Sequence, residues 1–256
     1  MRVSVISLER SHERRAAVTR RLKELGIAFE FFAAVDAAAG AHLQFPSFPN
    51  KLRSRYGGHL TPGEAGCFAS HALLWEECAA SGRPILILED NVDLAANFCD
   101  SLAAAQAELD RGAGFIRLVA LIQRRSVLLN EVSGNMRLVR YLKGPSGGQA
   151  YVLSPEGARR LLDGVKRWAE PLDDYLDRFW VHGLPALAIH PLTVTRADVP
   201  TTIPGREGYT GLKLFRRRLV RNWDGLFRLI YNLGAGFANA GPWVVSPEPR
   251  EPGKGT

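Results

Sequence analysis

Apolar residues along the first 200 positions form short unbroken runs that alternate with longer stretches of helical spacing. The clearest run is Ile85–Leu88, four aliphatic residues without a polar interruption, which predicts a strand buried on both faces. Further strands are expected at residues 2–8, 27–34, 115–121, 149–153 and 187–189. Because helical stretches separate these runs, the pattern predicts one α/β domain over residues 1–205 with a mostly parallel sheet.

Capping residues indicate where the predicted helices begin and end. The segment 61–64, Thr-Pro-Gly-Glu, combines an N-cap, a proline in the first turn and a capping box, so it predicts a helix running to about Ala80. A second helix is expected from the Ser11 cap to about Leu25, where Gly26 stops it. The other expected elements are helices at about 95–109, after Ser154-Pro155 and after Pro171, a loop at 37–60 and a hairpin-like stretch reaching 143.

Polar oxygen-bearing side chains gather at the end of the central strand. Glu89, Asp90, Asn91 and Asp93 follow it within five positions. Burying an unpaired carboxylate is costly, so we expect these side chains in a crevice, which is also where open α/β sheets bind ligands. Oxygen ligands suit Mg²⁺ or Mn²⁺ bridging the phosphates of a substrate. The alternative interpretation is a strand followed by an acidic turn, since a short acidic motif alone is only a hypothesis.

Composition and charge narrow the class of partner. The chain has 256 residues, 46% of them hydrophobic, and a formal net charge of +7, which favours anionic partners such as nucleotides, nucleic acid or an acidic membrane. Nucleic acid ranks last because no reading motif is present. The three cysteines, without a CxxC pair, indicate reduced thiols of a cytosolic protein. The first residues are too short and too strand-like for a signal peptide, and nothing before residue 229 predicts a membrane span.

The character of the chain changes in residues 206–256. The segment 211–232 contains six Lys or Arg residues and one Asp, with Phe215, Trp223 and Phe227 among apolar residues at helical spacing. This pattern predicts a basic amphipathic helix of the type that lies in a membrane interface, followed by a disordered tail. The alternative is a C-terminal helix that packs on the core and leaves a basic face in solvent.

Several segments in order resemble glycosyltransferase family 25, the lipopolysaccharide-type transferases that also include collagen galactosyltransferases. The matching segments are Val5–Arg10 with Glu13–Arg15, Phe32–Asp36, Leu60–His71, Ile87–Asn91, and Gly148–Tyr151 with Pro171–Asp173. The resemblance covers most of residues 1–205. It implies a GT-A-like nucleotide-sugar fold that moves a hexose, galactose or a similar sugar, from a UDP-sugar to a lipid-linked or lipopolysaccharide saccharide with inversion. Such an enzyme is expected in the cytoplasm, peripheral at the inner face of the plasma membrane.

The resemblance also implies a divalent-cation site, Mn²⁺ or Mg²⁺, at Asp90 and Asn91, with Glu89 or Asp93 in support. The family motif usually has a second Asp where this chain has Asn91. An amide oxygen still ligates these cations, but the lost charge should weaken the site. Asp93 compensates, or the cation requirement is relaxed, or the chain is an inactive or binding-only paralogue.

Residues that hold the donor are expected near the first strand and on the helix after Thr61. Arg10 and Arg14 follow the first strand, where a nucleotide would lie, although a solvated helix face is the commoner place for an Arg. Glu64 and His71 are two helical turns apart and share a face. They line the donor pocket together with Glu89, or they form a buried structural pair.

Inverting transfer is a single displacement and needs one general base. By resemblance to the later family block this base is Asp173, with its neighbour Asp174 left as an alternative. Without that role, both residues and Asp177 form the acidic first turn of a helix, which the helix macrodipole favours on its own.

Overall fold

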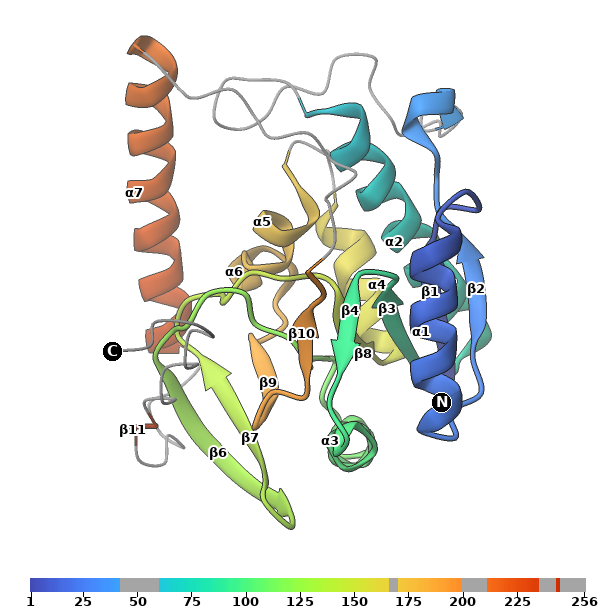
Figure 1. Ribbon diagram of the computed structural model, residues 1–256. Coiled ribbons are helices and arrows are strands. Elements are labelled where there is room, and N and C mark those ends of the chain that lie inside the picture. Colours follow the sequence, from blue (N-terminus) through green and yellow to red (C-terminus); the bar gives the residue numbers. More distant parts are fainter. Residues whose placement is uncertain (42–59, 166–169, 199–210, 235–242, 245–256) are drawn as a thin grey trace, which may run out of the picture.

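The structure of this chain is a computed structural model, and it describes residues 1–41, 60–165, 170–198, 211–234 and 243–244 (Figure 1). A nine-stranded sheet runs through it in the order β11-β6-β7-β9-β5-β8-β3-β1-β2. The strands of this sheet are β1 (Arg2–Ser7), β2 (Glu30–Ala33), β3 (Ile85–Glu89), β5 (Phe115–Arg117), β6 (Ser126–Ser133), β7 (Met136–Tyr141), β8 (Ala150–Leu153), β9 (Leu187–His190) and β11 (Trp243–Val244).

Strand direction confirms the expected mostly parallel sheet. The strands β2, β1, β3, β5, β9 and β6 run one way, while β8, β7 and β11 run the other way. The reversed strand β8 lies between β3 and β5 and pairs antiparallel with both of them. The sheet is therefore mixed, and β6 with β7 forms the hairpin that the sequence predicts before residue 143.

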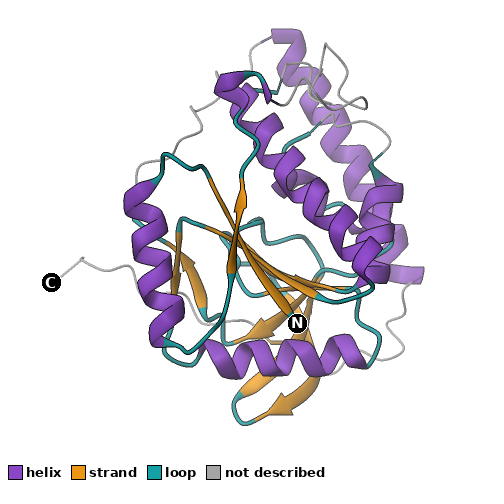
Figure 2. Ribbon diagram, turned by 90° about the vertical axis from the view of Figure 1, so that its right-hand side faces the viewer, coloured by secondary structure: helices purple, strands orange, loops and turns teal. Residues whose placement is uncertain are grey.

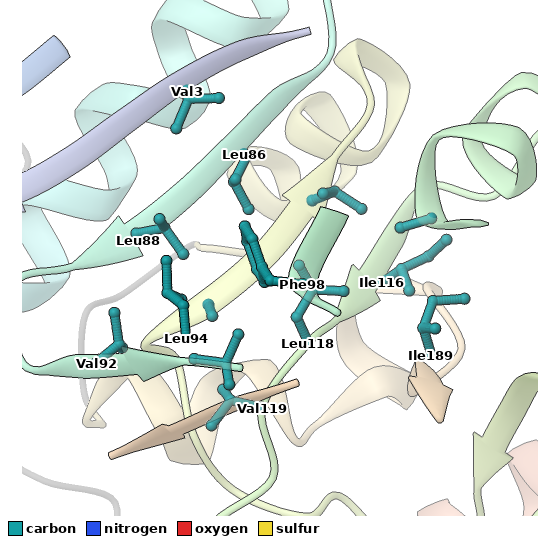
Figure 3. Packing of buried hydrophobic residues seen from close by; sticks show 14 of the residues in the cluster. Val3, Leu86, Leu88, Val92, Leu94, Phe98, Ile116, Leu118, Val119 and Ile189 are labelled. Atoms are coloured by element: carbon teal, nitrogen blue, oxygen red, sulfur yellow. The ribbon is translucent and has the colours of Figure 1, made fainter. Parts of the chain in front are cut away.

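Helices cover both faces of the sheet, as Figure 2 shows. The helices are α1 (His12–Glu24), α2 (Pro62–Ser81), α3 (Phe98–Asp110), α4 (Pro155–Gly164), α5 (Leu172–Leu176), α6 (Phe179–His182) and α7 (Gly211–Gly234), with a 3₁₀ turn η1 at Ala37–Ala39. Side chains of β3 alternate between the two faces: Ile85 and Ile87 pack with α2 and α4, and Leu86 and Leu88 pack with α1 and α3. Figure 3 shows Leu86 and Leu88 on the side of Phe98. All four are buried, so the prediction of a strand covered on both faces is confirmed.

The capping signals correspond to the helix ends in the structure. The Thr61 side chain accepts a hydrogen bond from the Glu64 N–H (3.3 Å), and the Glu64 carboxylate accepts one from the Thr61 N–H (2.8 Å), which completes the capping box. Gly82 ends α2 in the left-handed conformation, at φ 66°. Ser154 caps α4 through the Gly157 N–H, whereas Ser11 precedes α1 without a side-chain cap bond.

Two short strands were not predicted from the sequence. They are β4 (Val92–Leu94) and β10 (Val194–Arg196), which pair antiparallel in a sheet of their own. Three residues are too few for a periodic pattern to register, and only the burial of Val92 and Leu94 in the core shows why the pair forms. The helix expected at about 95 consequently begins at Phe98.

Some expectations fall outside the described residues. These are most of the loop at 37–60, in which only η1 and its neighbours are described, and the expected disordered tail. The segment 211–234 forms α7, a single helix beside α6 at the far end of the sheet from β2 (Figure 1). Among the helices that the structure describes, none is both long enough and apolar enough to cross a bilayer.

Candidate functional site

A cavity of about 600 Å³ opens at the carboxyl ends of β1, β2 and β3. Its walls come from four places: the ends of the three parallel strands, the start of α1, the 3₁₀ turn η1, and the first turns of α2. The polar groups that line it are Ser7, Arg10, Ser11, Arg14, Asp36, Thr61, Cys67, Ser70, His71, Glu89, Asp90 and Asn91. This is the edge at which α/β sheets bind ligands, and the volume suits a small-molecule ligand or cofactor.

Both carboxylate oxygens of Asp90 have a partner in the cavity wall. One oxygen of its carboxylate accepts a hydrogen bond from the Ser7 hydroxyl (2.7 Å), and the other lies 3.4 Å from Nη1 of Arg14. Only 9% of the Asp90 side chain and 16% of the Arg14 side chain are exposed. The predicted Arg14 and Asp90 are therefore brought together, with a cation already balancing the carboxylate.

Asn91 adds a second oxygen beside Asp90. Its Oδ1 atom is buried and has no hydrogen-bond partner among the described residues, which leaves an acceptor oxygen for a ligand. One carboxylate and one amide oxygen fit a hard divalent cation whose other ligands are water and phosphate. Asp93 lies in β4 with an exposed side chain, outside the lining of the cavity, so the structure does not bring it to this pair.

Arg10 lies at the rim of the cavity and is paired with Asp36. The Asp36 side chain also accepts a hydrogen bond from the Ala38 N–H, so it caps η1 as well. The Arg10 guanidinium, through hydrogen bonding, lowers the pKa of the Asp36 carboxyl. Arg10 is 58% exposed, so this ion pair contributes little to stability.

Of Glu64 and His71, only His71 lines the cavity in the structure. The Glu64 carboxylate closes the capping box and is absent from the cavity lining. His71 lines the cavity although its side chain is fully buried. Its Nδ1 is 2.7 Å from the Tyr151 hydroxyl, while its Nε2 is 3.6 Å from Oε1 of Glu89 and has no hydrogen-bond partner among the described residues.

Asp173 lies close to this group without lining the cavity. Burial and, after it, the negative charge of Glu89 together raise the pKa of Asp173 to about 6, against the opposing charge of Arg117. A raised pKa speaks against a carboxylate stabilised simply by a helix macrodipole, which would lower the pKa. Asp174 is the partly buried neighbour on the five-residue helix α5 and also stays outside the lining.

A buried ion pair holds the loop beside Asp173. Arg117 is fully buried and donates to the Gly147 carbonyl and to Asp177 (2.7 Å), whose second oxygen accepts a hydrogen bond from the Ser146 N–H (3.0 Å). Asp177 therefore anchors the loop at 144–148 and is unavailable as a third acidic group of the site. A Cβ atom at Gly148 would lie 2.7 Å from Cδ2 of Leu172 and 3.1 Å from the Asp173 carboxylate, so a larger residue there would displace these side chains.

Four polar groups of this region were not predicted as site residues. Ser7 and Asp36 stand at the ends of β1 and β2, and strand-end position was the signal that could have identified them. Tyr151, on β8, contacts His71, and Trp75, on α2, donates a hydrogen bond to the Tyr151 hydroxyl. Trp75 follows His71 by one helical turn, but the arrival of Tyr151 depends on the strand order of the sheet.

Comparison with known proteins identifies relatives of the chain. The model of the family described as Glycosyltransferase family 25 (LPS biosynthesis protein) matches residues 1–176. The lipooligosaccharide biosynthesis protein lic2B of Haemophilus influenzae is 29% identical, over 61% of this chain and 60% of the relative. Inactive glycosyltransferase 25 family member 3 of Mus musculus is 30% identical, over 74% and 36% respectively. Procollagen galactosyltransferase 1 of Danio rerio is 26% identical, over 81% and 37%.

The chain spans less than two thirds of the length of each of these three relatives. The family match nevertheless includes every strand and helix that lines the cavity, together with Tyr151 and Asp173.

Proposed function

The chain belongs to glycosyltransferase family 25, and from this premise we propose that it transfers a hexose from a UDP-sugar to a saccharide of lipopolysaccharide or lipooligosaccharide. We propose galactose as the hexose, by analogy with the procollagen galactosyltransferase among the relatives. In this proposal residues 1–205 form a GT-A-like donor-binding domain, and the reaction inverts the anomeric carbon. The observation that carries it is the cavity at the ends of three parallel strands, with Arg14, Asp90 and Asn91 in its wall.

The donor is held through its diphosphate. Arg14 and Arg10 are the cations on the α1 side of the cavity, and both side chains reach its lining. Asp90 and Asn91 would hold Mn²⁺ or Mg²⁺, which supplies charge neutralisation for the departing diphosphate. Arg14 already lies beside Asp90, so the protein places positive charge there in addition to the ion.

The base acts on the acceptor hydroxyl. We assign this role to Asp173, whose pKa of about 6 leaves it mostly ionised at neutral pH and still basic enough to accept a proton. Glu89 lines the cavity, precedes Asp90 in the sequence and acts electrostatically on Asp173, and we assign it to donor binding. Asp93 lies outside the cavity, so its proposed support of the cation would require a rearrangement of β4.

Hydrolysis of a panel of UDP-sugars tests the proposal. Purified protein is expected to release UDP slowly from one member of the panel, because water replaces the acceptor, and UDP-galactose is the member that we expect. Release should stop when EDTA removes the cation and resume when Mn²⁺ is added. The absence of turnover together with the absence of Mn²⁺-dependent UDP binding would overturn the proposal.

Asn91 favours one alternative function, an inactive or binding-only paralogue of the same fold. Four relatives are named as inactive or probable inactive family members, and an amide in place of a carboxylate weakens cation binding. Asn91→Asp separates the two cases. A large gain of Mn²⁺-dependent UDP release in this variant would support a decayed site, whereas an active enzyme should change little apart from tighter cation binding.

The exposed face of α7 supports a further part of the proposal, contact with an anionic membrane. Polar residues attach α7 to the rest of the protein: Tyr231 donates to the Gly183 carbonyl (3.2 Å), and Asn232 bonds with Arg140 (2.9 Å) and with the Leu142 carbonyl (3.0 Å). Eight large apolar residues of the helix are 45% to 58% exposed: Phe215, Leu219, Trp223, Leu226, Phe227, Leu229, Ile230 and Leu233. This arrangement does not match a helix that packs its apolar side on the core.

We propose that this apolar face lies in the headgroup region of an anionic bilayer on the cytoplasmic side. The occupant follows from charge, because exposed Arg218 and Arg221 flank the apolar residues on a helix with five more positive than negative side chains between 211 and 232. The arrangement would hold the enzyme beside a lipid-linked acceptor.

Vesicle co-sedimentation tests the membrane contact. The protein should bind vesicles that contain phosphatidylglycerol and bind far less to pure phosphatidylcholine or at high salt. Replacing exposed Trp223 and Phe227 by Glu should weaken vesicle binding about tenfold or more, because two aromatic rings would no longer be buried in the membrane. The matched control is Leu129→Glu, an exposed apolar residue on β6. Equal binding of both variants would refute the contact.

A further inference from the structure

Three side chains of different chemistry meet at the inner wall of the cavity. Potential ligand atoms of Cys67, His71 and Glu89 all lie within 4.8 Å of one another. His71 is fully buried, and its Nε2 atom faces Glu89 at 3.6 Å without a hydrogen-bond partner among the described residues. A buried polar atom left unpaired is costly, so this nitrogen indicates a place where a ligand atom completes the structure.

The other side of the His71 ring determines what this nitrogen offers. The Tyr151 hydroxyl lies 2.7 Å from Nδ1 of His71 and 2.8 Å from Nε1 of Trp75. The indole N–H is a donor only, so Tyr151 accepts from Trp75 and must give its own proton to another acceptor. Burial raises the pKa of Tyr151 far above its ordinary value, so the hydroxyl keeps that proton. Among the described residues the remaining partner is Nδ1, which therefore accepts this hydrogen bond, and the proton of the His71 ring lies on Nε2.

This tautomer disfavours a metal ion at the three side chains. A metal would need the lone pair of Nε2, and the Tyr151 proton would then lose its acceptor. A metal would also need a thiolate at Cys67, whereas burial and then the charge of Glu89 raise the pKa of that thiol. The three side chains therefore offer a donor, Nε2–H of His71, beside an acceptor, the Glu89 carboxylate, with the Cys67 thiol next to them.

A hydroxyl group satisfies both atoms. A phosphate oxygen accepts from Nε2–H but cannot donate to Glu89, and its charge would face the carboxylate. A sugar hydroxyl accepts from His71 and donates to Glu89 at the same time. We propose that His71 and Glu89 form a subsite for one hydroxyl of the donor sugar, with Tyr151 and Trp75 as positioning residues that fix the His71 tautomer. The inference rests on the proposed function, since it names the part of the donor that this wall binds.

The tautomer is tested on the ligand-free protein. Two-bond ¹H–¹⁵N correlation spectra of the imidazole rings report which nitrogen carries the proton, and His71→Gln identifies the His71 signals by their loss. We expect a protonated Nε2 in the natural sequence and a mixture of tautomers in Tyr151→Phe. A protonated Nδ1 in the natural sequence overturns the inference, whatever the protein catalyses. A Zn²⁺-induced shift of the His71 nitrogens that disappears in Cys67→Ser also overturns it.

The hydroxyl is tested by calorimetry with UDP-galactose and its monodeoxy analogues in the presence of Mn²⁺. One analogue should bind about tenfold to a hundredfold more weakly than UDP-galactose, the usual effect of losing a hydrogen bond to a charged group. His71→Leu should weaken the binding of UDP-galactose and reduce the discrimination against that analogue, because only the hydrogen bond to Glu89 remains. His71→Gln should restore part of the discrimination, because its amide N–H replaces Nε2–H.

The outcomes separate the subsite from the enzyme. UDP-galactose binding with discrimination that is undiminished in His71→Leu, or with no discrimination at all, overturns the subsite and leaves the proposed function standing. If no UDP-sugar binds although Nε2 is protonated, the proposed donor is wrong. The proposal that this subsite binds a hydroxyl of the donor sugar is then wrong as well.

Discussion

Asp173→Asn is expected to lower UDP release from UDP-galactose by about 10²-fold to 10⁴-fold, the range for loss of a general base. The amide keeps the size and a hydrogen-bonding oxygen of the side chain but cannot take a proton. The measurement is kcat/KM with the donor in the presence of Mn²⁺. Asp174→Asn is the matched comparison on the same short helix, and a larger loss there would move the base to Asp174.

The pH profile gives Asp173 an independent signature. The base must be ionised, and its pKa is raised to about 6, so kcat/KM should fall as pH drops through 6 and level off above it. Asp173→Asn should lose this limb. A limb near pH 6 that persists in Asp173→Asn would show that another group titrates.

The same substitution should stabilise the fold at neutral pH. A carboxyl whose pKa rises from 3.8 to about 6 on folding favours the folded state below pH 3.8, and this contribution is lost as pH rises through 6. Removing the charge should add roughly 1–3 kcal/mol to the free energy of unfolding at pH 7. If Asp173 only formed the first turn of a helix, its loss would instead cost a few tenths of a kcal/mol.

Asp90→Ala is expected to abolish UDP release, with a loss of about 10²-fold to 10³-fold or more and no rescue by excess Mn²⁺. The Asp90 carboxylate is the one charged ligand in the proposed cation site of Asp90 and Asn91. Electrostatic groups of this kind contribute that much to catalysis. Asp90→Asn is the second variant, because an amide oxygen can still accept the hydrogen bond from Ser7 and preserve the fold. This variant should keep the melting temperature of the natural sequence and lose the UDP release that depends on Mn²⁺.

Asp93→Ala provides the control for position. Its side chain is exposed on β4 and lies outside the cavity, so donor turnover should stay within about twofold of the natural sequence. Equal losses of UDP release in the Asp90 and Asp93 variants would contradict a cation site formed by Asp90 and Asn91 alone and would place both carboxylates in the site.

The parts of the fold that are local in sequence could be predicted, and the parts set by distant pairing could not. Thr61 and Glu64 close their capping box within four residues, and Ile85–Leu88 is buried on both faces, as its composition indicates. The strands β4 and β10 depend on each other across about 100 residues, and neither carries a pattern of its own. The direction of β8 depends on pairing with β3 and β5 and leaves no mark in residues 150–153.

The residues of the site also divide into those that sequence order could place and those that depend on distant contacts. The positions of Asp90, Asn91 and Arg14 at one cavity follow from strand ends and from the helix that comes after β1, so sequence order was sufficient. Glu64 shares a helix face with His71, yet its carboxylate turns back to the cap, because an unpaired N–H at a helix start is a nearby and strong donor. The hydrogen bonds of His71 depend on Tyr151, 80 residues away, and no local rule predicts them.

The insertion of β8 between β3 and β5 governs the order in which the chain can fold during synthesis. Residues 85–89 and 115–117 leave the ribosome with no partner along the edges that β8 later occupies. Until residue 153 has emerged, two hydrophobic strand edges remain open, and such edges are prone to pair with other chains. The nascent protein therefore passes through a window of about 40 residues, from β5 to β8, in which a chaperone that shields β-edges would contribute most to its yield.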